Sequence, residues 1–72
     1  MTVDEAVKIA KEHCPNEYAR CYLDAAKKAI ELDGVHAFKV QILYALSNMS
    51  YWRGPVAREV QAVLKRYANS KD

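Results

Sequence analysis

The chain has 72 residues with only two glycines and two prolines, which is enough for one domain with a radius of gyration of about 11 Å. This length excludes a Rossmann fold, a barrel and a multidomain enzyme. With 51% hydrophobic residues, 28% charged residues and a net charge of +2, the composition is globular and excludes a disordered or collagen-like chain. We therefore expect residues 1–72 to form a single domain.

The charges are divided unevenly along the chain. Residues 1–33 carry seven acidic and five basic side chains, whereas residues 34–72 carry two acidic and six basic ones. Such an asymmetry says nothing about the fold, but it is a hint that the protein meets charged partners.

The cysteines and the N-terminal segment favour an intracellular protein. Cys14 and Cys21 are seven positions apart, which on one helix separates them by about 10 Å along the axis. A disulfide needs Cα atoms within about 7 Å, so we expect free thiols and a reducing compartment. The acidic residues 1–5 do not resemble a signal peptide, and the longest apolar run, 42–46, is far shorter than the ~20 residues of a membrane span. We expect a cytoplasmic protein with no membrane partner.

The first half of the chain predicts two helices, over about residues 3–13 and 15–33. Thr2 and Glu5 have the spacing of a capping box, and apolar residues at helical spacing follow. Pro15 disfavours helix in the residue before it and suits the first turn of the second helix. Gly34 supplies the C-terminal cap of that helix. The predicted apolar face of the second helix consists of Tyr18, Tyr22, Ala25, Ala29 and Leu32, with Ala26 and Ile30 beside it.

The second half predicts two more helices, over about residues 35–52 and 55–69. The main apolar stripe of the third helix is Phe38, Ile42, Ala45, Leu46 and Met49, and a second line is Ala37, Val40, Tyr44 and Tyr51. Apolar residues on two sides are typical of a central helix. The predicted inner face of the fourth helix is Val56, Val60, Val63, Leu64 and Tyr67. No alternating strand pattern occurs, so the sequence predicts an all-α fold, a small bundle of four short helices.

Few residues have the chemistry of catalysis or of metal binding. His13, Cys14, Cys21 and His36 are metal-ligating types, but they form no Cys-x-x-Cys or His-x-x-x-His pair. Cys14 beside His13 suggests a nucleophile and a base, yet residues adjacent in sequence rarely orient for base catalysis. The two glycines form no phosphate loop. We therefore expect a non-enzymatic protein without a metal or another cofactor.

The segment that joins the third and fourth helices has the most unusual chemistry. It contains Tyr51, the single tryptophan Trp52 and Arg53 at the start of a helix whose free amides attract anions. Arg58 lies one turn further along. Aromatic and arginine side chains are common interface hot spots, so this segment is a candidate for binding phosphate, a nucleotide or an acidic protein surface. The alternative is that Trp52 seals the end of the bundle while Arg53 is solvated.

Our first hypothesis is a binding protein that acts by occupying a surface of a protein partner. Five tyrosines against one phenylalanine favour an interface, because tyrosine offers contact area at low entropic cost. The second apolar line of the third helix is a candidate surface for a partner or a homodimer, unless the neighbouring helices enclose it. The candidate partner-binding residues are Tyr44, Tyr51, Trp52, Arg53 and Arg58.

A second hypothesis is nucleic-acid binding by the basic face of the fourth helix. Arg58 and Lys65 are seven residues apart and project from one side, so a helix-turn-helix could present them on a recognition helix. The low net charge and the absence of a tight glycine turn count against it. The candidate residues are Arg58, Lys65, Arg66 and Asn69. A third hypothesis is a sponge for a small anionic nucleotide, held near Arg53 at the start of the fourth helix.

Residues 40–64 carry three short runs that together suggest a context. The runs are Gln41-Ile42-Leu43-Tyr44, Leu46-Ser47-Asn48, and Tyr51-Trp52-Arg53-Gly54 followed by Ala57-Arg58-Glu59-Val60. This segment, about a third of the chain, resembles one found in small uncharacterised proteins of tailed bacteriophages and prophages. The resemblance assigns no functional residue. It implies an accessory protein that binds host or phage proteins, such as an inhibitor of a bacterial defence system, or a small DNA-associated protein.

Overall fold

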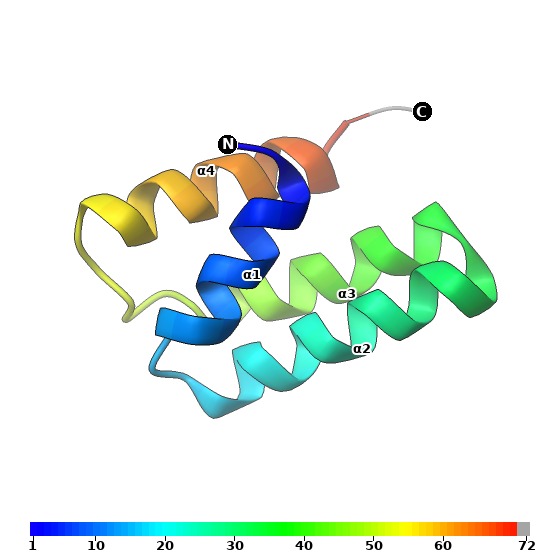
Figure 1. Ribbon diagram of the computed structural model, residues 1–72, viewed down its shortest axis with the longest axis horizontal. Coiled ribbons are helices and arrows are strands. Elements are labelled where there is room, and N and C mark those ends of the chain that lie inside the picture. Colours follow the sequence, from blue (N-terminus) through cyan, green and yellow to red (C-terminus); the bar gives the residue numbers. More distant parts are fainter. Residues whose placement is uncertain (71–72) are drawn as a thin grey trace.

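The chain folds into four α-helices over residues 1–70, the part that this computed structural model describes, and no strand occurs in that range. The helices are α1 (Val3–His13), α2 (Glu17–Asp33), α3 (Val35–Ser47) and α4 (Pro55–Ala68). The prediction of an all-α, four-helix fold is confirmed (Figure 1). No helix within the described range is both long and apolar enough to cross a membrane.

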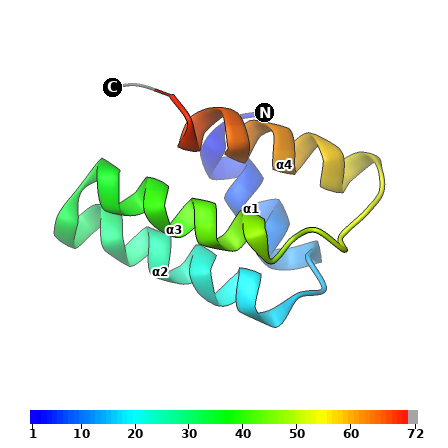
Figure 2. The same cartoon turned by 180° about the vertical axis from the view of Figure 1, so that it is seen from behind.

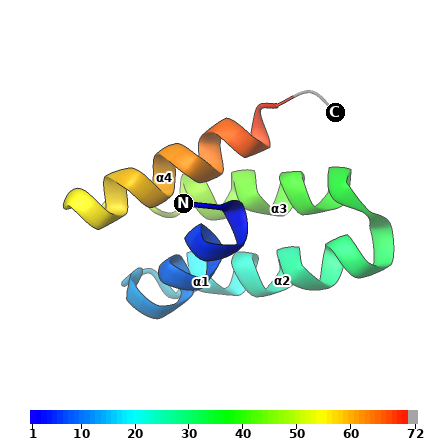
Figure 3. The same cartoon turned by 45° about the horizontal axis from the view of Figure 1, so that its top comes forward.

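The four helices form a hairpin covered by a second pair. Figure 1 shows α2 and α3 running antiparallel, while α1 crosses the hairpin steeply and α4 lies alongside α3. Seen from behind, α3 and α4 lie side by side with α1 behind them (Figure 2). With the top turned forward, α1 lies in front of the hairpin and α4 above it (Figure 3). The radius of gyration is 10.9 Å, as the length predicts.

Local signals set the beginning of α1 and the junction between α2 and α3. The hydroxyl of Thr2 accepts the backbone N–H of Glu5 at 3.1 Å, and the Glu5 carboxylate accepts the N–H of Thr2 at 3.3 Å. This is the predicted capping box. Gly34 turns the chain from α2 into α3. Its φ of +87° is a backbone conformation that residues with a Cβ rarely adopt.

The predicted start of α2 is wrong by two residues. Asn16 is the N-cap, with extended backbone, and its side chain accepts the N–H of Ala19 at 3.0 Å. The helix therefore begins at Glu17 and leaves Pro15 outside it. The helix starts after Asn16, and not at Pro15, because the Asn16 side chain satisfies an amide that the first turn of a helix would otherwise leave unpaired.

The predicted end of α3 is also wrong, since the helix stops at Ser47 and not at residue 52. The carbonyl oxygen of Tyr44 accepts hydrogen bonds from Ser47 Oγ at 2.7 Å and from Asn48 Nδ2 at 3.0 Å. These side chains satisfy a carbonyl of the last turn and release the chain into a loop over residues 48–54. Helix α4 begins at Pro55 as predicted and ends one residue earlier than predicted.

The core combines alanines of α1, α2 and α3 with larger apolar side chains from all four helices. Its buried members are Ala6, Val7, Ala10, Cys14, Ala19, Leu23, Ala26, Phe38, Ile42, Ala45, Met49, Val60 and Leu64. The predicted main stripe of α3 is confirmed, with Leu46 half-buried beside it. The predicted inner face of α4 is confirmed at Val60 and Leu64 but not at Val56, which is half-exposed.

The predicted apolar face of α2 is confirmed only in part. Tyr22, Ala25 and Ala29 are half-buried, and Ala26, predicted to lie beside that face, is buried. Tyr18 and Leu32 are 71% and 81% exposed, whereas the buried side chains of α2 are Ala19, Leu23 and Ala26. Two alanines flanking one leucine let the backbones of α2 and α3 approach closely, which a face of tyrosines would prevent. The larger aromatic side chains therefore stay at the margin of the interface.

Candidate functional site

One side chain of α4 holds the loop that joins α3 to α4. Gln61 Nε2 donates to the carbonyl oxygens of Met49, at 3.1 Å, and Trp52, at 3.0 Å. Met49 is buried, and the half-buried Trp52 packs against the core. The loop is therefore held by hydrogen bonds to its backbone and by packing of its apolar side chains. Together these contacts position the residues that follow Trp52.

A groove of about 670 Å³ runs between α3 and α4, on residues of both helices and of the loop. It is lined by Leu43, Leu46, Ser47, Ser50, Arg58, Gln61, Ala62, Lys65 and Asn69. We call its apolar residues, Leu43, Leu46 and Ala62, the floor of the groove. Leu43 is 45% exposed and Ala62 is also exposed, so part of this floor is open to solvent. The floor is the feature that distinguishes this groove from an ordinary polar surface.

Positive charge borders this floor. Arg58 and Lys65 are exposed and seven residues apart on α4, which separates their Cα atoms by about 10.5 Å along the helix. No carboxylate among the described residues lines the groove. Glu59 follows Arg58 in sequence but is turned about 100° away around the helix.

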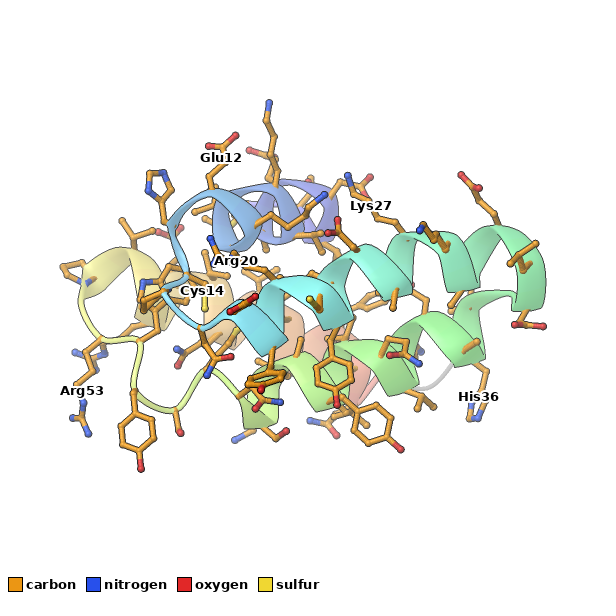
Figure 4. The ribbon with its side chains drawn as sticks, turned by 90° about the horizontal axis from the view of Figure 1, so that it is seen from below. Glu12, Cys14, Arg20, Lys27, His36 and Arg53 are labelled. Atoms are coloured by element: carbon orange, nitrogen blue, oxygen red, sulfur yellow. The ribbon has the colours of Figure 1, made fainter. Side chains whose placement is uncertain are left out.

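A smaller hollow of about 400 Å³ continues the groove toward the loop. It shares Ser50, Arg58 and Gln61 with the groove and adds Trp52, Arg53 and Gly54. Figure 4 shows Arg53 projecting from the loop, away from the helices. We call the groove and this hollow together the basic groove, whose cations are Arg53, Arg58 and Lys65.

The structure separates the residues of the first hypothesis into two groups. Trp52, Arg53 and Arg58 meet in the basic groove. Tyr44 instead packs against Tyr22 of α2, with ring centroids 5.5 Å apart, and so contributes to a different face. Tyr51 is 87% exposed. The side chain of Trp52 packs against the core and also lines the hollow, so its role in binding stays a prediction.

The residues of the nucleic-acid hypothesis are also divided. Arg58, Lys65 and Asn69 line the basic groove, whereas Arg66 lines a separate hollow between the N-terminus and the end of α4. The connection between α3 and α4 is seven residues long, over 48–54, compared with three or four in a helix-turn-helix. The basic face of α4 therefore exists, but the compact turn of that motif does not.

The small-ligand hypothesis corresponds to a third hollow, of about 550 Å³, between the end of α1 and the start of α4. Its lining includes His13, Arg53 and Val56. The N-terminus of α4 has no side-chain cap, since its N-cap is Gly54. Arg53 is the one arginine or lysine in this lining, so the hollow offers less positive charge than the basic groove.

The metal-ligating and nucleophilic types that the sequence singled out do not come together. Cys14 is buried at the C-terminal end of α1, and Cys21 is exposed on α2, both as free thiols. Figure 4 places His36 at the opposite end of the hairpin from Cys14. Within residues 1–70, no three His, Cys, Asp or Glu side chains are grouped in a way that would hold a metal ion.

A carboxylate outside the groove, Asp24, has its pKa shifted by a neighbouring lysine. Lys11 of α1 forms an ion pair with Asp24 of α2. The hydrogen bond and the charge of Lys11 hold the pKa of Asp24 below its ordinary value, although partial burial opposes the shift. This pair ties the two helices together at the surface.

The sequence patterns did not identify Leu43 and Gln61 as groove residues, whereas Ala62 was expected on the same face of the fourth helix as Arg58, Lys65 and Asn69. Leu43 lies on neither of the two predicted apolar lines of α3, and a large apolar residue off the core stripe is a signal of an exposed patch. The role of Gln61 had no sequence signal, because its partners are backbone carbonyls nine and twelve residues away.

Comparisons of this chain with protein-family models, with curated proteins and with solved structures found no match. Its function is therefore inferred from the chemistry of its own surface.

Proposed function

We propose that this protein is a non-enzymatic binding protein that captures a segment of a protein partner in the basic groove. The observation that supports this function is the combination of an open apolar floor, at Leu43 and Ala62, with Arg58 and Lys65 at its border. Protein interfaces have an apolar centre within a polar rim, and tryptophan and arginine are prominent among their hot spots. Trp52 and Arg53 extend the same surface.

Catalysis is not part of the proposal. Among the described residues, the lining of the basic groove includes serines and cations but no histidine or carboxylate that would act as a general base. The hydroxyl of Ser47 donates a hydrogen bond to the carbonyl oxygen of Tyr44, so it is not activated as a nucleophile. Burial keeps Cys14 away from any substrate.

The context that we propose is that of a phage-type accessory or inhibitor protein in the cytoplasm. Residues 40–64, which resemble a segment of small phage proteins, include all of the basic groove except Lys65 and Asn69. An inhibitor of this kind acts by covering a surface of its target. Two free cysteines are compatible with a reducing compartment.

Nucleic-acid binding is the second candidate function. It is favoured by the alignment of Arg58, Lys65 and Asn69 along one groove. The apolar floor argues for a protein segment instead, because the phosphate backbone that dominates nucleic-acid affinity offers nothing apolar to cover it. A net charge of +2 is also small for a protein that binds phosphates.

The test is to select binders from a random peptide library and to measure their affinity for matched variants. Leu43→Gln changes the floor, and Leu32→Gln makes the same substitution at an exposed position of α2. We expect selected peptides to bind the wild type and Leu32→Gln equally and to bind Leu43→Gln at least ten-fold more weakly. Circular dichroism checks that all three proteins keep their helices. Peptides that bind all three alike, or a selection that yields none, would show the proposal to be wrong.

A further inference from the structure

We infer that the occupant of the basic groove is an acidic amphipathic helix of a partner protein, an inference that rests on the proposed function. Its apolar side chains would cover Leu43, Leu46 and Ala62, and its carboxylates would pair with Arg58 and Lys65. Arg53 would form an ion pair with a further acidic side chain of the partner, beyond the end of the floor.

The inference begins with cations that have no acidic partner in the described part of the chain. The ion pairs within residues 1–70 are Lys11 with Asp24 and Glu12 with His13, and none involves a cation of the basic groove. Three exposed cations line one surface whose described lining includes no carboxylate, so this surface has a positive potential. A partner of opposite charge is steered to such a surface and is favoured over basic competitors.

The spacing of the cations favours a helical partner. Arg58 and Lys65 are two helical turns apart, about 10.5 Å along the axis of α4. Acidic residues at positions i and i+7 of a helix lying along α4 have the same separation and project from one side. Apolar residues at i+3 and i+4 lie on that side between them, which matches the position of Ala62 between the two cations of α4. This arrangement is the helix-in-groove mode of recognition.

A second copy of the chain fits this groove less well. Glu17, Asp24 and Glu31 do recur every seven residues on the exposed side of α2. However, Asp24 is already paired with Lys11, and Lys28 projects among these acids from the same side. The acidic stripe of α2 is therefore partly neutralised, whereas a separate acidic helix would present uninterrupted carboxylates.

The experiment uses one synthetic peptide and two double variants of the whole protein. The peptide is an amphipathic helix with glutamates at i and i+7 and leucines at i+3 and i+4, and its binding is measured by fluorescence anisotropy. Arg58→Glu with Lys65→Glu reverses the charge of the groove. Arg20→Glu with Lys27→Glu is the matched control, because these exposed residues are also seven apart and lie on α2 (Figure 4).

We expect the acidic peptide to bind the wild type and the α2 control with similar affinity and the groove variant at least ten-fold more weakly. The affinity for the wild type should fall as salt is raised. A peptide with lysine in place of each glutamate should show the reverse preference and bind the groove variant. This rescue separates a charge contact from a loss of folding.

Four outcomes would overturn the inference, and the first three leave the proposed function intact. The first is equal binding of a peptide with glutamine in place of glutamate. The second is that peptides selected from the random library need Leu43 but are neutral or basic, in which case the groove binds protein segments without a preference for acidic ones. The third is that sedimentation shows self-association that the groove variant abolishes. The fourth is that duplex DNA binds where the acidic peptide does not, which would contradict the proposed function as well.

Discussion

The side chain of Lys39 in α3 is hydrogen-bonded to Ser70, which lies beyond the end of α4. Its Nζ donates to the carbonyl oxygen of Ser70 at 2.9 Å and to the hydroxyl oxygen at 3.1 Å. Lys39 is only 7% exposed, and its ammonium lies 5.3 Å from the centroid of the Tyr67 ring. These contacts compensate for burial of the charge and fasten the end of α4 to α3.

The Lys39 contact has two separable components, its charge and its apolar stem. We expect Lys39→Ala to lower the free energy of unfolding by about 2 kcal/mol, since it removes the packing of the stem as well as the charge. Lys39→Met should lower it by less than about 1 kcal/mol, because methionine keeps the stem and removes the cost of burying an ammonium. Urea denaturation measures both. An equal loss in the two variants would mean that the hydrogen bonds, and not the packing, carry the stability.

Gln61 should control the order of the loop before α4. Gln61→Leu leaves the carbonyl oxygens of Met49 and Trp52 without this donor, so we expect a loss of about 1–2 kcal/mol in stability. Amide hydrogen exchange in residues 48–54 should become faster in the variant than in the wild type. Exchange in α2, which is not bonded to this side chain, should stay the same. Unchanged exchange in the loop would show that the packing of Trp52 alone holds it.

The ion pair between Lys11 and Asp24 predicts a pH dependence. The pKa of Asp24 is below its ordinary value of 3.8, so the carboxylate stabilises the fold above that pH. The contribution is lost as the pH falls through the lowered pKa. We expect Asp24→Asn to melt slightly below the wild type at neutral pH and to match it in strong acid. The effect should be small because Asp24 is exposed, and Glu31→Gln, outside this pair, is the control. A difference that persists in strong acid would contradict the assignment.

The two thiols should differ in reactivity. Cys21 is exposed on α2 and Cys14 is buried at the end of α1. We expect a thiol reagent to modify one cysteine per chain under native conditions and both in denaturant, with mass spectrometry of peptides locating the first at Cys21. Native modification of Cys14 at a similar rate would show that the end of α1 opens readily. Cys21→Ser serves as the control that isolates Cys14.

The number of helices and most of their ends could be predicted because they depend on interactions between near neighbours in the chain. The capping box joins Thr2 and Glu5, which are three positions apart, and Gly34 acts through its own backbone angle. The apolar period of α3 identified Phe38 and Ile42 as core residues. Where two local signals competed, as at Pro15 and Asn16, the outcome depended on which one satisfied a backbone amide.

The sequence by itself thus determined an all-α fold, an uneven charge distribution and the cationic positions of α4. Only the tertiary structure decided that Ala19, rather than Tyr18, faces the core, because that choice depends on how closely α2 approaches α3. It also decided that Leu43 shares a groove with Arg58 and Lys65. Side chains on different helices meet through packing of the whole chain, and no spacing within a single helix encodes that meeting.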